Sequence, residues 1–209
     1  MEFSTWLAFF AASWAISLSP GAGAIAAMSA GLNHGFARGY FMSLGLVVGI
    51  LTQVVVVGVG LGALIAASGL AFSLIKWAGV AYLVWLGIRQ WRAPARPLVA
   101  EMANTGPVRR RTLVLKGWMV NAVNPKGTVF LLAVVPQFLD LQQALAPQYA
   151  TIGATLAFTD LVVMALYTVL AARVLRLLRT ERQMRALNRA FGSLFVAVGV
   201  LLASFKRAG

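Results

Sequence analysis

Long apolar runs recur along the whole chain, and short polar linkers separate them. Five of the runs are long enough to cross the hydrocarbon core of a bilayer as helices, and a sixth is shorter. The six segments are Phe3–Met28, Tyr40–Ala66, Leu70–Gln90, Leu113–Phe138, Tyr149–Ala172 and Ala190–Phe205. The pattern predicts an all-α integral membrane protein with six transmembrane helices. Five spans is the alternative, if the sixth segment stops short of crossing.

The composition favours the same fold class. Hydrophobic residues make up 60% of the 209 residues and charged residues 11%, whereas a soluble domain is nearer half apolar and a quarter charged. The formal net charge of +13 could suit nucleic acid, but the basic residues concentrate in Arg89–Lys116 and Arg173–Arg189, between apolar runs. Basic loops of this kind are what membrane topology requires, so no nucleic-acid partner is expected. The chain has no cysteine, which excludes disulfides and thiolate metal sites.

Arginine residues collect in alternate linkers. Arg38 lies in the first linker, and most other arginines lie in the third and fifth, whereas linkers 67–69 and 139–148 contain no Lys or Arg. The positive-inside rule places the basic linkers in the cytoplasm, so both ends of a six-span chain face outward. The N-terminal run is expected to be the first span, because it lacks the basic start of a signal peptide. The stretch Arg173–Arg189 is basic and amphipathic, and is expected to form a cytoplasmic helix on anionic headgroups.

The linker Arg92–Arg111 is the longest polar stretch and divides the six segments into two sets of three. It separates a first repeat, 1–91, from a second repeat, 112–209, within a single membrane domain. An odd number of spans in each half inserts the second half upside down relative to the first. The sequence therefore predicts two inverted three-helix repeats.

The first segment of each half is interrupted near its middle by proline. Ser19 precedes Pro20 in the first half, and Asn124 precedes Pro125 in the second. Serine and asparagine are good N-cap residues, and proline is favoured at the first helical position, so each segment is expected to form two half-helices. Interrupted helices at matching places in inverted halves indicate the binding site of a transporter.

The predicted orientation points both new half-helix N-termini at the membrane midplane from opposite sides. Each carries about half a positive charge, so a small carboxylate could bind between them. The substrate-binding candidates at the breaks are Ser19, Pro20, Gly21, Gly23, Asn124, Pro125, Lys126 and Gly127. The alternative is two proline kinks with no ligand, because proline and glycine are common in membrane helices.

The second segment adds one polar candidate and a series of glycines. Gln53 lies near mid-span and is a further substrate-binding candidate, although one hydrogen bond to a neighbouring helix would also satisfy it. The glycines indicate close helix packing. They are Gly35, Gly39, Gly45, Gly49, Gly58, Gly60 and Gly62.

Asp160 is the one acidic residue among five that lies deep in a segment. A charge at the bilayer centre costs about 2.5–3.5 kcal/mol on insertion scales, so Asp160 should face protein or water. It could bind a substrate ammonium, or carry the proton that drives exchange, because a carboxyl group removed from water holds a proton more readily. It could instead pair with Lys126 in a purely structural role. Lys126 could also meet a substrate carboxylate.

These motifs resemble the lysine-exporter (LysE) superfamily, in particular its homoserine/threonine resistance (RhtB) branch, along nearly the whole chain. The proline motifs are "SPGAGAI" at Ser19–Ile25 and "NPKG" at Asn124–Gly127, with "PQF" at Pro136–Phe138. The stretches "LNHG", "KWAGVAYLVWLGIRQWR" and "QMRALNRAFGSLFVAVGVLLAS" carry the closer similarity to that branch. Many superfamily members have proline and asparagine where this chain has Ala22 and Gly23.

The resemblance implies proton-motive-force-driven export of small neutral amino acids or derivatives, such as homoserine, homoserine lactone or threonine, across a bacterial inner membrane. The expected partners are the substrate, protons and membrane lipid, and a homo-oligomer is a further possibility. No cofactor or metal is expected. One alternative is a permease or channel-like protein for another amino acid or small solute. A lipid-modifying membrane enzyme is the other, but one histidine and one deep acid are few groups for that chemistry.

Overall fold

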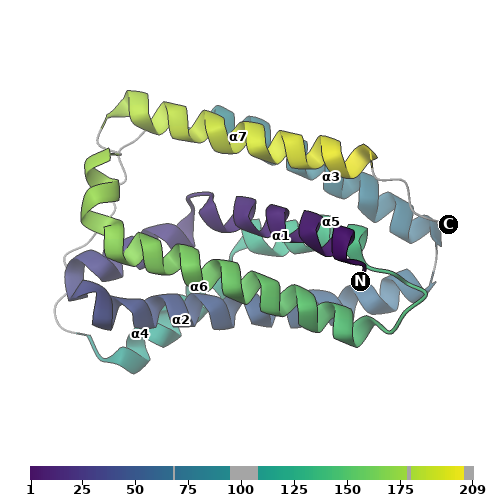
Figure 1. Ribbon diagram of the computed structural model, residues 1–209, viewed down its shortest axis with the longest axis horizontal. Coiled ribbons are helices and arrows are strands. Elements are labelled where there is room, and N and C mark those ends of the chain that lie inside the picture. The colour runs from purple at the N-terminus through teal and green to yellow at the C-terminus, as the bar shows by residue number, and fades with distance from the viewer. Residues whose placement is uncertain (68, 95–107, 178–179, 205–209) are drawn as a thin grey trace.

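The computed structural model describes residues 1–67, 69–94, 108–177 and 180–204. The described residues form helices and contain no strand, which confirms the all-α fold (Figure 1). The helices are α1 (Phe3–Leu18), α2 (Ala22–Ala67), α3 (Gly69–Trp91), α4 (Arg110–Ala122), α5 (Pro125–Val134), the short 3-10 helix η2 (Val135–Phe138), α6 (Leu145–Leu177) and α7 (Glu181–Ser204).

Two stretches of helix in the described part of the chain are long and apolar enough to cross a membrane. They are Ala22–Gly60 and Leu145–Ala171. A third candidate is the pair Arg110–Ala122 and Pro125–Phe138, which is bent by 52° and counts if the two pieces form one broken span. Helix α1 is apolar but shorter. The described residues therefore contain two or three candidate spans by this criterion, and the six-span topology stays a prediction.

Both interrupted segments are present. Helix α1 ends at Leu18 and α2 begins at Ala22, while α4 ends at Ala122 and α5 begins at Pro125. Asn124 is the N-cap of α5, as predicted, with Pro125 in its first turn. The prediction that Ser19 caps the following helix is wrong. Ser19 is the C-cap of α1, because its N–H bonds back to the Ala15 carbonyl and the new helix begins three residues later.

The predicted amphipathic helix over Arg173–Arg189 is also wrong. Helix α6 continues to Leu177, and α7 begins at Glu181 and continues to Ser204 without a break. Arg173 and Arg176 therefore lie at the end of α6, and Arg182, Arg185 and Arg189 lie in the first turns of α7. The linker residues 95–107 lie outside the described residues.

Gly35 divides α2 between the first and second predicted segments. Its φ of 70° and ψ of 173° are non-helical, and no atom would lie within 4 Å of an added Cβ. The prediction that Gly35 serves close packing is therefore wrong. The position needs glycine for its backbone, since side-chain-bearing residues are strained in this region of φ/ψ space.

We expect Gly35→Ala to lower the free energy of unfolding by about 1–3 kcal/mol. Gly60→Ala is the matched control, because Gly60 also has nothing within 4 Å but lies inside regular helix. Thermal unfolding of both variants in detergent measures the difference. Equal midpoints for Gly35→Ala and the wild type would contradict this explanation of the kink.

Helices from the two halves of the chain pack closely against each other. Helix α2 packs on α4 and α6, and α3 packs on α7 in a separate layer (Figure 1). Glycines set the closest approach: a Cβ at Gly45 would lie 2.1 Å from the Val114 carbonyl oxygen, and one at Gly117 would lie 2.2 Å from that of Met42. Small residues at such crossings let helix backbones meet, as membrane helices prefer.

A shared core fixes the interrupted segments relative to each other. Phe9 of α1, Phe130 of α5 and Phe195 of α7 are almost fully buried in one apolar cluster. Ile152 and Leu156 bring α6 into the same cluster. Because van der Waals packing is a main source of helix association in membranes, this cluster holds the break after α1 next to α5 and α6.

Candidate functional site

At the break after α1, the free backbone carbonyls accept hydrogen bonds from side chains of the second half of the chain. The Tyr167 hydroxyl donates to the Leu18 carbonyl at 2.7 Å. Lys126 Nζ donates to the carbonyl and the hydroxyl of Ser19, at 3.1 and 2.6 Å. Backbone groups left unpaired at membrane depth are costly, so irregular backbone occurs there only where protein or a cavity supports it. Side chains of α5 and α6 provide that support.

At the break between α4 and α5, the free backbone carbonyls accept hydrogen bonds from a side chain of the first half of the chain. Gln53 Nε2 lies 2.7 Å from the Asn121 carbonyl oxygen, 2.9 Å from that of Asn124 and 2.9 Å from Thr128 Oγ1. Gln53 is 3% exposed. The Asn124 side chain accepts the N–H of Lys126 at 3.1 Å, which starts α5. The carbonyl groups that the bend frees thus meet one amide from α2.

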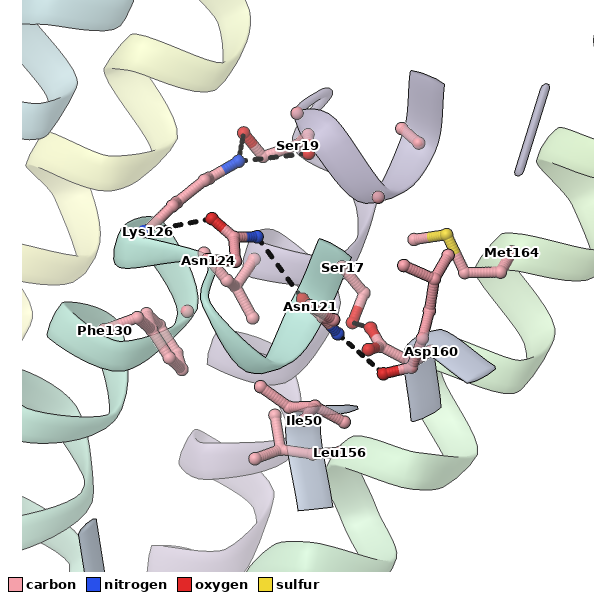
Figure 2. A pocket seen from close by; sticks show the side chains of 16 residues that line it. Ser17, Ser19, Ile50, Asn121, Asn124, Lys126, Phe130, Leu156, Asp160 and Met164 are labelled. Atoms are coloured by element: carbon pink, nitrogen blue, oxygen red, sulfur yellow. Dashed lines mark hydrogen bonds between the residues drawn. The ribbon is translucent and has the colours of Figure 1, made fainter. Parts of the chain in front are cut away.

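The two breaks and the middle of α6 enclose a small cavity (Figure 2). Its volume is about 60 Å³, room for a few water molecules. Its polar lining comes from Ser17, Ser19, Asn121, Asn124, Lys126 and Asp160. Its other lining residues are Ile16, Gly21, Gly23, Ala24, Leu46, Ile50, Gly127, Phe130, Leu156 and Met164. A space of this size between apolar walls suits only a small solute.

Asp160 and Lys126 line this cavity from different elements, and each bonds to a serine near the end of α1. The Ser17 hydroxyl donates to Asp160 Oδ1 at 2.6 Å, and Lys126 Nζ bonds to Ser19. Lys126 Nζ also lies 5.4 Å from the centre of the Phe195 ring. Within the described residues no ion pair joins Lys126 to Asp160. The predicted structural pairing of the two charges is therefore not a direct salt bridge.

Most of the predicted site residues lie together. Seven of them line the cavity: Ser19, Gly21, Gly23, Asn124, Lys126, Gly127 and Asp160. Pro20, Pro125 and Gln53 do not line it. The two prolines lie at the helix breaks. Gln53 donates to backbone carbonyls of the α4–α5 bend, which matches the alternative that a hydrogen bond to a neighbouring helix satisfies it.

Sequence reasoning missed several residues of the site. Ser17 and Asn121 lie inside helices, two and three residues before the break residues Ser19 and Asn124, and both line the cavity. Asn121 donates to the Leu46 carbonyl at 2.7 Å. Their polarity close to a break was an available signal. Tyr167 lay in an apolar run and gave no such signal.

We expect Gln53→Ala to destabilise the protein by about 1–3 kcal/mol, because it leaves buried carbonyls of the α4–α5 bend without a donor. Thermal unfolding in detergent measures this effect. Gln143→Ala, at an exposed loop position, is the control and should unfold like the wild type. A Gln53→Ala midpoint equal to that of the control would show that the amide does not stabilise the bend.

The family model for LysE type translocators matches residues 14–205. The chain belongs to this family. The match includes both breaks, Lys126 and Asp160, so the cavity lies within the part of the chain that defines a LysE translocator.

Named relatives of this LysE translocator cover its full length or nearly so. The homoserine/homoserine lactone efflux protein of Salmonella typhimurium strain LT2 is 47% identical over 209 residues, all of both chains. An uncharacterized membrane protein of Vibrio cholerae is 42% identical over 206 residues, 99% of this chain and all of that one. The leucine efflux protein of Enterobacter sp. strain 638 is 27% identical over 192 residues, 90% of each chain. No solved structure matches the LysE translocator significantly.

Proposed function

We propose that this LysE translocator exports small neutral amino acids or their derivatives, such as homoserine, homoserine lactone and threonine, driven by the proton-motive force. The observation that carries the proposal is the small cavity at two helix breaks, with one base and one acid in its lining. The protein is a multi-pass protein of the bacterial inner membrane. The 47% identical Salmonella relative, named for efflux of homoserine and its lactone, supports this substrate class.

The cavity is complementary to a zwitterion. Lys126 provides a cation for the substrate carboxylate, and the start of α5 at Asn124 and Pro125 adds the positive end of a helix dipole. Asp160 Oδ1 already accepts from Ser17, and the carboxylate faces the cavity, where a substrate ammonium can bind. The apolar walls formed by Leu46, Ile50 and Phe130 leave the side chain of the substrate little room.

The count of charges in the cavity favours a neutral amino acid over a dibasic one. Among the described residues that line the cavity, Asp160 is the one acid. A second ammonium would therefore enter at membrane depth without a counter-charge, which is expensive. Homoserine, threonine and homoserine lactone each carry a single ammonium, so one carboxylate is sufficient.

Asp160 also provides a means of coupling transport to protons. The side chain is 8% exposed and bonds to a serine hydroxyl instead of a cation. A proton and a substrate ammonium both neutralise a carboxylate, and they compete for the same oxygen atoms. Binding of one in place of the other makes proton entry and substrate exit alternate at the same residue.

The arrangement of the helices supports two inverted repeats, 1–91 and 112–209, joined by the linker 92–111. The break in each half is satisfied by the other: Gln53 of α2 reaches the α4–α5 bend, and Tyr167 of α6 reaches the end of α1. Helix α1 begins and α7 ends on one side of the molecule, whereas α4 begins on the other (Figure 1). Inverted repeats with broken helices around a midplane site suit alternating access.

Export from preloaded cells that lack their own exporters tests the proposal. Cells expressing the wild-type chain should release labelled homoserine and threonine faster than cells with an empty vector, and an uncoupler should abolish the difference. Release that persists with the uncoupler would indicate a channel-like protein. No release of either compound would contradict the proposed substrate class.

A further inference from the structure

A second cavity lies away from the helix breaks, between the end of α3 and the start of α7. Its volume is about 410 Å³. Trp91 and Arg92 contribute to its lining from the end of α3, and Glu181, Arg185 and Arg189 from the first turns of α7. The proposed export function uses none of these residues.

The charge of this cavity is strongly positive. Three arginines and one glutamate line it. Glu181 pairs with Arg185 at 3.5 Å, but both side chains are more than half exposed, and such pairs are weak. In the described part of the chain no carboxylate pairs with Arg92 or Arg189. Two guanidinium groups therefore face the cavity without a counter-charge among those residues.

The cavity is held in place by a firm contact between α3 and α7. Asn188 is 4% exposed, accepts from Gln90 Nε2 at 3.0 Å and donates to the Ala93 carbonyl at 3.2 Å. The Trp91 indole donates to the Arg189 carbonyl at 2.7 Å. These bonds join two segments that are about a hundred residues apart. They hold the end of α3 and the start of α7, which carry the arginines, in fixed positions relative to each other.

An apolar, exposed surface continues from the cavity. Ile88 and Trp85 lie one and two turns before Arg92 on the same face of α3, and they are 44% and 49% exposed. In a membrane protein such side chains face acyl chains. Trp91 is 52% exposed at the cavity itself, where an amphipathic ring suits the boundary between headgroups and hydrocarbon. The positive cavity thus opens toward lipid.

We propose that this cavity binds the phosphate group of an anionic phospholipid, with the acyl chains along the exposed apolar side chains of α3. Guanidinium groups recognise phosphate oxygens through paired hydrogen bonds, and basic pockets between membrane helices bind anionic headgroups. Free inorganic phosphate offers the same head chemistry. The exposed apolar side chains beside the cavity favour the lipid, because acyl chains can pack against them and a free phosphate ion cannot.

Native mass spectrometry of the purified full-length chain, incubated with phosphatidylglycerol or phosphatidylethanolamine in detergent, tests this proposal. We expect the wild type to retain phosphatidylglycerol in preference to phosphatidylethanolamine. The double variant Arg185→Gln/Arg189→Gln should retain at most about one tenth as much phosphatidylglycerol as the wild type. Arg182→Gln is the matched control, because Arg182 is exposed on the same helix but does not line the cavity. Arg185→Lys/Arg189→Lys, which keeps the charge, should retain more lipid than the glutamine variant.

Several outcomes would overturn the proposal. Equal retention of the two lipids by the wild type would do so without any variant, and so would equal loss in Arg182→Gln and the double variant. Inorganic phosphate at millimolar concentration should displace little of the lipid. Complete displacement would assign the cavity to a soluble anion instead.

Discussion

Lys126→Gln is expected to raise the homoserine concentration for half-maximal export by roughly 30-fold or more. The substitution removes the cation that lines the cavity and leaves the Ser19 carbonyl without its donor. Loss of one partner of a buried charged contact costs about 2–5 kcal/mol, and each 1.4 kcal/mol is a factor of ten in affinity. Initial rates of labelled homoserine export over a range of internal concentrations measure the change.

Homoserine lactone separates binding from folding in the same variant. The lactone keeps the ammonium of homoserine but has no free carboxylate, so export of the lactone should suffer much less from Lys126→Gln. Lys116→Gln, at an exposed position of α4, is the control and should export both compounds normally. An equal loss for the acid and the lactone would show that Lys126 supports the break after α1 and does not bind the carboxylate.

Asp160→Asn is expected to abolish export driven by the proton gradient for homoserine and its lactone alike. Both compounds present an ammonium, and the neutral amide neither pairs with it nor carries a proton. The amide keeps nearly the shape of the carboxylate and can still accept from Ser17, so the fold should persist. The measurement is release from preloaded cells with and without an uncoupler, at matched membrane abundance.

Asp140→Asn is the matched control, because Asp140 lies in the loop between η2 and α6, away from the cavity. It should export homoserine at the wild-type rate. Export by Asp160→Asn that still responds to the uncoupler would remove Asp160 from the coupling step. A selective loss for homoserine, with lactone export intact, would show that Asp160 does not bind the ammonium that both compounds carry, against the proposed orientation.

Local chemistry predicted one break correctly and the other only in part. Asn124 and Pro125 start α5 as expected, because an N-cap and a proline act within a single turn. The same reasoning assigned Ser19 to the following helix. Ser19 instead ends α1, and its side chain accepts from Lys126, a residue more than one hundred positions away. A tertiary contact of this kind leaves no trace in the local sequence.

The charges of the site were easier to predict than their neighbours. Asp160 and Lys126 stood out because charges at membrane depth are costly, and they do line one cavity. Gln53 was a reasonable binding candidate by depth alone. Only the packing of α2 on α4 shows that its amide meets the bent backbone. Gly35 is a similar case. The number of glycines in this segment suggested close packing, whereas the positive φ of Gly35 shows that it forms a kink in α2.

Proton movement in proteoliposomes tests most directly whether the cavity exchanges substrate for protons. Purified protein is reconstituted with a pH-sensitive dye inside, and an outward homoserine gradient is imposed without a membrane potential. The account predicts acidification of the lumen that accompanies homoserine exit in the wild type and is absent in Asp160→Asn. Homoserine exit from wild-type vesicles without any pH change would contradict it.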